Sequence, residues 1–285
     1  MLEAFSMPVA GQWVHGTLQV PARFSAPGAC VLFLVGPSTT RAGPNRIHVA
    51  MAAALEAAGI ASCRFDYRGR GESTGSEEAV RVPQMIDDSR AVVRRIHELL
   101  RRDTQNFLVA NCLGCVVGLR LMEVEPAVSA GVFVGAPEFS EQAAAPIDRG
   151  QLRETLIKYS RKLRSASTWA RLWRGDIDYR SVGQALTTDT FRRYRSRLGA
   201  REAQRYTGAQ PLAGRHAAFF WGENDPARIE RDAYARFCAS RGWSMRSDVI
   251  AHAAHNFGRQ PWARALTERV VEEVRQLIES TRGAP

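Results

Sequence analysis

The run CVLFLVG (30–36) limits most strongly how this chain can fold. It is apolar up to Gly36, and Pro37 follows it. A strand with one solvated face alternates apolar and polar side chains, whereas a continuous apolar run is typical of a strand buried on both faces of a parallel sheet. Parallel strands need long crossover connections, which are usually helices. We therefore expect a helix after residue 36 and another strand beyond it.

The rest of the chain shows this alternation. Apolar side chains recur at helical spacing from Ile47 to Ala58, and Gly59 ends them. Further strands are expected at 60–66, 106–111, 128–136, 215–222 and near 243–250, and further helices from near Pro83, at 113–122, near 227–239 and over 262–278. An antiparallel hairpin at the sheet edge is expected within 12–24. The pattern predicts an α/β fold with a mostly parallel central sheet flanked by helices.

One segment, 138–210, breaks this rhythm because it is polar, rich in arginine and helical in tendency. We expect one globular core made of residues 1–137 and 211–285, with 138–210 inserted as a helical cap or lid. From Arg149 to Arg201 the chain has fourteen basic and four acidic side chains, which accounts for its whole formal net charge of +10. The positive charge is therefore concentrated in the expected cap.

Composition excludes several classes of protein. No apolar run approaches the roughly 18 to 20 residues of a membrane span, and the first residues lack the pattern of a signal peptide, so we expect a cytoplasmic protein. The five cysteines are expected to be reduced. No nucleic-acid-binding motif accompanies the basic segment, and no second pair of cysteines or histidines has the spacing of a metal site. We expect no metal and no cofactor, and the oligomeric state stays open.

A candidate nucleophile lies at the corner between the strand 106–111 and the helix 113–122. In VANCLGCVVG, Cys112 is flanked by Ala110 and Gly114 at the two positions where a nucleophile elbow needs small residues. The N-terminus of the helix favours a thiolate, which would lower the pKa of the cysteine. Two other interpretations remain open: Cys112 as a small buried side chain, and Cys112 with Cys115 as a redox Cys-x-x-Cys motif.

An acid and a base follow Cys112 in the chain, in that order, and each lies just after an expected strand. Asp225, in GENDP, comes after the strand 215–222, and His255, in AHAAHNF, comes after the last strand. A base activates the nucleophile, and an acid orients the base. His252 is the alternative base.

Beyond this order, FDYRGRGEST (65–74), the elbow, GENDP and HNF resemble motifs of the α/β-hydrolase superfamily over about residues 30–281. GPSTTRAG, Arg46 and the Arg/Trp-rich cap also resemble bacterial hydrolases associated with exopolysaccharide loci of the exosortase type. The resemblance implies an α/β-hydrolase fold, a triad of Cys112, Asp225 and His255, and an oxyanion hole formed by the Leu113 N–H and a second amide. Because Pro37 has no N–H, that second donor is expected to be Ser38 or Thr39.

A cysteine nucleophile favours thioester substrates, because exchange between thioesters is nearly isoenergetic and a thiolate needs no base to activate it. We expect an acyl hydrolase or acyltransferase that forms an acyl-cysteine. The basic cap favours an acidic acyl carrier protein as the donor of the acyl group, and two alternatives stay open: a small anionic substrate, and a solvated basic face with no specific partner. The residues expected to bind substrate or partner lie in the cap: Arg161, Arg164, Trp169, Arg171 and Trp173. The alternatives are a carboxylesterase or lactone hydrolase linked to exopolysaccharide metabolism, and a hydrolase-fold binding protein without activity.

Overall fold

The computed structural model describes five stretches of the chain, namely residues 1–24, 28–77, 80–100, 104–137 and 212–282. The expected cap, 138–210, lies outside these stretches, and the proposed domain boundaries remain a prediction. None of the helices in the described stretches is both long enough and apolar enough to cross a membrane.

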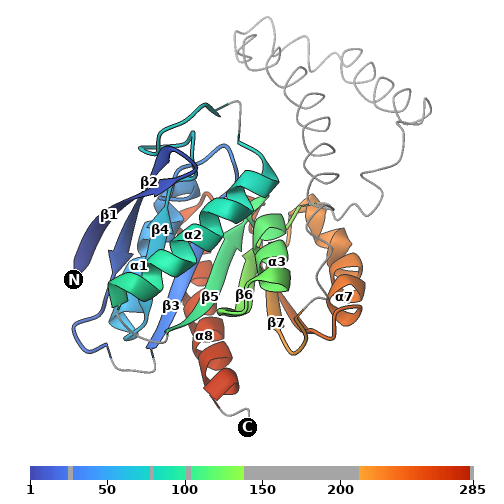
Figure 1. Ribbon diagram of the computed structural model, residues 1–285. Helices are drawn as coiled ribbons and strands as arrows, with labels where there is room; N and C mark the ends of the chain where they lie inside the picture. The colour runs from blue at the N-terminus through green and yellow to red at the C-terminus, as the bar shows by residue number, and fades with distance from the viewer. Residues whose placement is uncertain (25–27, 78–79, 101–103, 138–211, 283–285) are drawn as a thin grey trace, which may run out of the picture. The chain divides into compact units, whose positions relative to one another are not determined.

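A single eight-stranded sheet forms the centre of the fold, in the order β1-β2-β4-β3-β5-β6-β7-β8 (Figure 1). Its strands are β1 (Leu2–Val9), β2 (Gln12–Gln19), β3 (Gly28–Leu34), β4 (Ala61–Phe65), β5 (Thr104–Asn111), β6 (Val128–Val134), β7 (His216–Gly222) and β8 (Ser244–Ile250). Strands β3 to β8 pair in parallel, and β1 and β2 add an antiparallel edge. The predicted α/β class with a mostly parallel sheet is confirmed.

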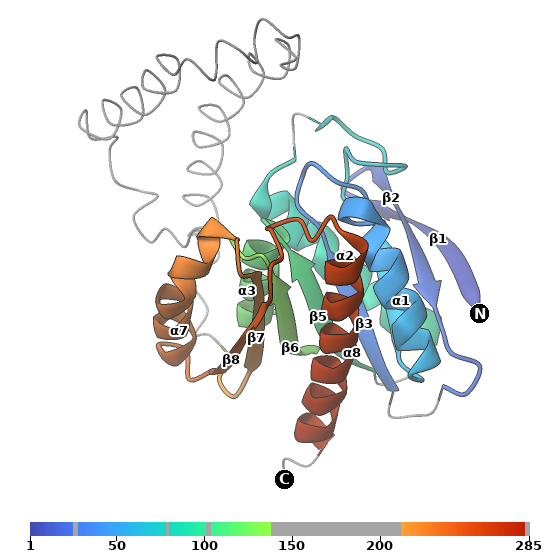
Figure 2. The ribbon, with the colours of Figure 1, turned by 180° about the vertical axis from the view of Figure 1, so that it is seen from behind.

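Helices cover both faces of this sheet. Helix α1 (Ile47–Ala57) and the C-terminal helix α8 (Gln260–Arg282) lie together on one face, as Figure 2 shows from behind. Helices α2 (Val82–Leu100) and α3 (Gly114–Val124) pack side by side on the other. The Tyr234 ring of α7 (Arg231–Ala239) packs on Phe219 of β7 on this second face. Two short 3₁₀ turns, η1 (Pro44–Arg46) and η5 (Pro226–Glu230), precede α1 and α7.

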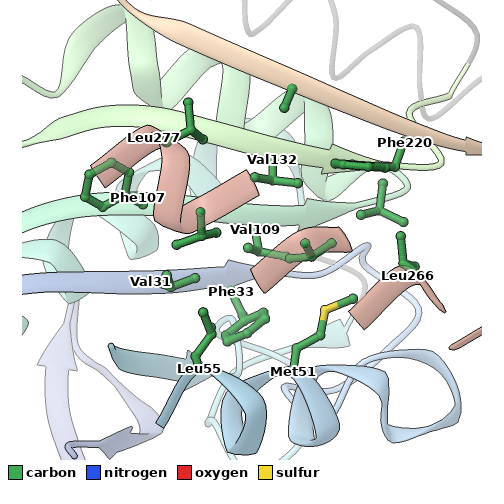
Figure 3. Close-up of a cluster of buried hydrophobic side chains, with 14 of the residues drawn as sticks. Val31, Phe33, Met51, Leu55, Phe107, Val109, Val132, Phe220, Leu266 and Leu277 are labelled. Atoms are coloured by element: carbon green, nitrogen blue, oxygen red, sulfur yellow. The ribbon is translucent and has the colours of Figure 1, made fainter. Parts of the chain in front are cut away.

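The hydrophobic core explains why the central strands are apolar along their whole length. Strand β3 is buried at every position. Its alternate residues Val31 and Phe33 join a cluster between the sheet and helices α1 and α8, where Met51 and Leu266 meet them (Figure 3). The intervening residues face the layer of α2 and α3 across the sheet. Both faces of the strand are therefore removed from water, which accounts for the uninterrupted apolar run.

The edge hairpin differs from its prediction. The segment 12–24 was expected to supply both strands of the hairpin, but it supplies only β2. The partner strand is β1, which begins at Leu2. The turn between them is Ala10-Gly11, where both residues have positive φ (47° and 78°). Such a turn favours Asn-Gly or Asp-Gly, so alanine gave no turn signal in the sequence. The helix expected near 227–239 also starts later, at Arg231, because η5 occupies the preceding residues.

Gly114 allows the first turn of α3 to pass close to strand β3. A Cβ atom at this position would lie 2.5 Å from the carbonyl oxygen of Leu34, well inside van der Waals contact. The obstacle is backbone, which cannot move aside as a flexible side chain can. This close approach fixes where α3 starts, and hence where the residues before it lie.

We predict that Gly114→Ala lowers the free energy of unfolding by about 1 to 3 kcal/mol, the usual cost of overpacking a tight core. Urea denaturation followed by circular dichroism measures the change. The matched control is Gly36→Ala, because a Cβ there meets nothing nearer than 3.8 Å. Equal unfolding midpoints for the two variants would contradict the prediction.

Candidate active site

Cys112 lies between β5 and α3 in a strained conformation. Its φ is 53°, in the left-handed region that costs a residue with a Cβ roughly 1 to 2 kcal/mol. The Cys112 N–H donates to the carbonyl of Val134 at 3.1 Å, and Leu113 begins α3 as its N-cap residue. Cys112 is also partly exposed, whereas the other four cysteines are buried. This is the geometry of a nucleophile elbow, which holds a reactive side chain out of the sheet over the helix N-terminus.

Asp225 and His255 come together from two loops at the C-terminal ends of β7 and β8. The Asp225 Oδ2 atom lies 2.8 Å from His255 Nδ1. Its other oxygen, Oδ1, accepts from the N–H of Ala227 at 3.0 Å and caps η5. The Asp225 side chain is only 1% exposed. A buried carboxylate with both oxygens engaged holds the imidazole in one orientation.

His255 also forms a side-chain hydrogen bond with Cys112. Because Nδ1 faces Asp225, Nε2 is the ring nitrogen left for the sulfur. The hydrogen bond to Asp225 and then the one to Cys112 raise the pKa of His255 to about 10, against an opposing effect of burial. The raised pKa favours the imidazolium form of the ring, and a cation beside the sulfur favours the thiolate.

Gly135, just after β6, makes room for this imidazole. It was not among the residues expected at the site. It has a φ of 55°, and a Cβ would lie 3.2 Å from His255 Cε1 and 3.3 Å from Nδ1. The Gly135 N–H donates to the carbonyl of Phe220 at 2.8 Å, which fixes the turn. The available signal was the glycine ending the apolar run VFVG.

The alternative base, His252, lies elsewhere in the same loop. Its side chain is 85% exposed, and its Nδ1 lies 3.2 Å from an oxygen of Glu223. Its backbone N–H donates to the same carboxylate at 2.7 Å. His252 thus forms a surface pair with Glu223, while His255 contacts Asp225 and Cys112.

Cys115, the second cysteine of the Cys-x-x-Cys motif, points away from the site. It is fully buried, and its Sγ lies 3.4 Å from the carbonyl oxygen of Ala110 and 3.6 Å from that of Val134. Burial raises the pKa of the Cys115 thiol well above its usual value. A thiol held in this way is a poor redox partner, which argues against the thioredoxin-like interpretation.

The loop after β3 lies against Cys112 and bears on the oxyanion hole. A Cβ at Gly36 would lie 3.8 Å from the Leu113 nitrogen and 3.9 Å from Cys112 Sγ, so the glycine leaves space over the Leu113 N–H. The N–H of Thr39 donates to the carbonyl of Gly36 at 3.2 Å and closes a turn. Of the two expected second donors, the Thr39 N–H is thus engaged in this turn, and Ser38 stays the candidate.

Asp66 ties this loop to the next one along the sheet edge. Its carboxylate accepts from the Arg41 N–H at 2.7 Å, from the Arg41 guanidinium and from the Glu72 N–H at 3.3 Å. Its carbonyl accepts from Ser73 Oγ at 2.6 Å. Asp66 belongs to FDYRGRGEST, so the role of this motif here is to fasten two loops beside the site. The expected binding residues of the cap, Arg161, Arg164, Trp169, Arg171 and Trp173, lie outside the described residues.

Solved structures of low sequence identity share this fold along nearly the whole chain. DcsB in complex with its substrate analogue has a TM-score of 0.65 at 15% identity and covers 100% of both chains. A thermostable carboxyl esterase from Bacillus coagulans has a TM-score of 0.65 at 12% identity, covering 97% of this chain and 99% of its own. Est1E from Butyrivibrio proteoclasticus, with bound ferulic acid, has a TM-score of 0.63 at 14% identity, covering 97% and 100%.

The sheet order, the elbow and these likenesses define an α/β-hydrolase fold, as the sequence predicted. Residues 45–206 match the family model described as serine aminopeptidase S33. That match spans more than half of the chain, so the protein belongs to the serine aminopeptidase S33 family of hydrolases. A search of curated proteins found no match by sequence.

We predict that the His255 imidazole titrates near pH 10 and that Asp225→Asn moves its pKa toward the ordinary value of about 6.5, because the variant removes the largest cause of the shift. Because the folded pKa is raised, the stability contributed by this proton is fully present below about pH 6.5 and is lost as pH rises through about 10. The ring is 41% exposed, so solvent reduces that contribution. NMR titration measures the His255 pKa in the wild type and in Asp225→Asn. The His255 signal is assigned as the one that is missing from His255→Gln. A wild-type pKa near 6.5 would exclude the charged pair.

Proposed function

We propose that this protein is an acyl hydrolase or acyltransferase that uses Cys112 as its nucleophile, His255 as acid and base, and Asp225 to orient His255. The observation that carries the proposal is the continuous contact from Asp225 through His255 to Cys112. All three lie on loops at the C-terminal edge of the sheet, where this fold places its catalytic groups.

The first half-reaction follows from this arrangement. The Cys112 thiolate attacks the carbonyl carbon of the substrate, and the carbonyl π electrons move to oxygen. The N–H of Leu113 and that of Ser38 donate to this oxyanion. When the tetrahedral intermediate collapses, the bond to the leaving group breaks, and the His255 imidazolium supplies its proton to that group. The acyl group then remains on Cys112 as a thioester, and His255 is neutral.

The second half-reaction reverses these roles. Neutral His255 takes a proton from water, an alcohol or an amine as that molecule attacks the acyl-cysteine carbonyl. Collapse of the second intermediate releases the product and restores the thiolate beside the imidazolium. The acyl-cysteine is itself an activated thioester, so the acceptor decides whether the outcome is hydrolysis or acyl transfer.

Thioesters are the substrates that suit this nucleophile best. Transfer of an acyl group from one thiol to another changes the free energy little, and a thiolate paired with an imidazolium is ready to attack without prior proton removal. Activated esters and lactones react by the same steps. The alternative of a binding protein without activity gains no support from the site, because the strained Cys112 contacts His255 instead of packing inertly.

Carrier-protein delivery is the second part of the proposal and rests on charge. The basic segment Arg149–Arg201 carries the whole net charge of the chain, and an acidic acyl carrier protein would be attracted to it. Arg161, Arg164 and Arg171 are proposed to contact the carrier, and Trp169 and Trp173 to line the acyl pocket. The phosphopantetheine arm of such a carrier ends in the thioester that Cys112 is suited to attack.

We predict that an acyl thioester or a p-nitrophenyl ester adds one acyl mass to Cys112, because the thiolate forms a covalent intermediate. Intact-protein and peptide mass spectrometry after rapid acid quench detects the adduct. Cys112→Ala should give none, and Cys115→Ala, which alters only a buried neighbour, should still be labelled.

Matched histidine variants test the base in the same assay. His255→Ala should slow labelling or turnover about 10²- to 10⁴-fold, the usual contribution of a general acid or base, whereas His252→Ala should leave it near wild type. If His255→Ala labels and turns over at the wild-type rate, the triad is wrong.

We predict that reversing Arg161, Arg164 and Arg171 to glutamate raises KM for a carrier-bound acyl thioester at least about tenfold, because opposite charges steer association. KM for a small neutral acyl thioester should change little. Steady-state kinetics at low and high salt measures both, and added salt should reduce the difference. Equal effects on the two substrates would reject docking of a carrier protein.

A further inference from the structure

Arg64, in β4, is a largely buried residue without an acidic partner among the described residues. It is only 9% exposed. The buried carboxylates Asp66 and Asp88 are each paired with an arginine, Arg41 and Arg68 respectively. Within the described ranges, by contrast, no carboxylate lies at ion-pair distance from Arg64, and no oxygen accepts a hydrogen bond from it. A guanidinium in a largely buried residue keeps only part of its hydration, so an anion bound to it would be stabilised by charge-assisted hydrogen bonds.

Other cations surround Arg64. Arg41 and Arg46, both on the segment between β3 and α1, lie close enough for their charges to contribute, after burial, to lowering the pKa of Arg64. Arg41 is already paired with Asp66 and Glu72. Arg46 is exposed and, like Arg64, has no carboxylate partner in the described part of the chain. Two of the three guanidinium groups therefore have no carboxylate partner among the described residues.

Polar atoms without partners share the sheet face with Arg64. In the register of the sheet, Arg64 pairs with Thr17 of β2 and Phe33 of β3, so the three side chains point the same way. The ring of His48 packs on Phe33 with centroids 4.8 Å apart. Thr17 Oγ1, His48 Nδ1 and Ser62 Oγ are buried and lack a hydrogen-bond partner among the described residues. Hydroxyl and guanidinium donors thus gather under the start of α1.

His48 adds hydrogen-bonding capacity to this cluster but no charge. Burial, and then the nearby Arg64 charge, lower the pKa of His48 to about 3. The ring is neutral at physiological pH and has one N–H donor and one acceptor nitrogen. The positive charge of the cluster comes from its arginines alone.

We propose that Arg64 and Arg46 form a binding site for an anionic oxygen group, a phosphate or a carboxylate, with Thr17, Ser62 and His48 beside it. Guanidinium groups bind such oxygens with charge-assisted hydrogen bonds, often bidentate. Arg64 lies at the C-terminal end of β4, the sheet edge that also carries Cys112. The segment that starts beside Cys112 at Gly36 ends at Arg46, so an anion bound to Arg46 and Arg64 would anchor the far end of the loop that borders the oxyanion hole.

Thermal unfolding of the full chain with increasing inorganic phosphate, at constant ionic strength, tests the site. Wild-type Tm should rise by about 5 to 10 °C when phosphate reaches roughly 100 times its Kd. Arg64→Met and Arg46→Gln should lose most of this shift. Arg64→Met without phosphate should unfold no lower than wild type, because it removes an unpaired buried charge.

The matched control is Arg264→Gln on α8, an exposed arginine paired only with Glu268, which should keep the full shift. A wild-type Tm that does not respond to phosphate, or an equal shift in wild type and both site variants, would overturn the proposal. Arg46 is exposed, so its variant supplies the test even if Arg64→Met fails to fold.

The anion can belong to the substrate or be free in solution, and kinetics distinguishes these sources. The kinetic experiment rests on the proposed thioester chemistry, whereas thermal unfolding with phosphate does not. If the substrate carries the anion, phosphate raises KM for a phosphate-bearing acyl thioester, and Arg64→Met raises KM for it more than for a neutral one. If a free anion acts on the loop, phosphate changes kcat for both substrates. If the wild-type protein shows the phosphate-dependent Tm shift but no acyl adduct on Cys112, the proposed function is rejected and the anion site is retained.

Discussion

Burial of the central strands on both faces is the constraint from which the site follows. Strand β3 can be apolar at every position only because α1 and α8 cover one face and α2 and α3 the other. Strands covered in this way run parallel and are joined by crossovers, so their C-terminal ends meet at one edge. Gly36, Cys112, Gly135, Asp225 and His255 all follow such strand ends. The chemistry is assembled there because the hydrophobic core leaves that edge to loops.

Buried carboxylates hold these loops in place. Asp225 joins the loop after β7 to His255, and Asp66 joins the loop after β3 to the loop after β4. Each buried oxygen is satisfied by N–H donors or a guanidinium, which makes such pairs costly to break once formed. The loops around Cys112 therefore gain order from charge-assisted hydrogen bonds, while the sheet gains its stability from apolar burial.

The parts of the molecule that depend on local patterns along the chain, such as apolar runs, could be predicted from the sequence. Strands β3, β5 and β6 each contain a continuous apolar run and lie within about two residues of their expected positions. Strand β1 was missed because its turn uses Ala10, a residue without turn preference. Cys112, Asp225 and His255 could be proposed because each follows a recognisable strand. The role of Gly135 could not be, because it depends on two loops meeting in space, and the engagement of the Thr39 N–H depends on the exact turn geometry.

The raised pKa of His255 bears on the proposal that Cys112 is the nucleophile, because the family model is named for serine. A serine nucleophile needs a neutral imidazole to take its proton. Here the hydrogen bonds of His255 to Asp225 and to Cys112 raise the His255 pKa to about 10, which favours the charged imidazolium at neutral pH. An imidazolium cannot deprotonate a serine, but it stabilises a neighbouring thiolate. In a Cys112→Ser variant, the hydrogen bond between His255 and Cys112, which is one cause of the raised pKa, would be replaced by a hydrogen bond to a neutral hydroxyl. In the proposed mechanism the nucleophile and the base thus depend on each other's charge, and replacing the sulfur by oxygen would change both partners of the pair.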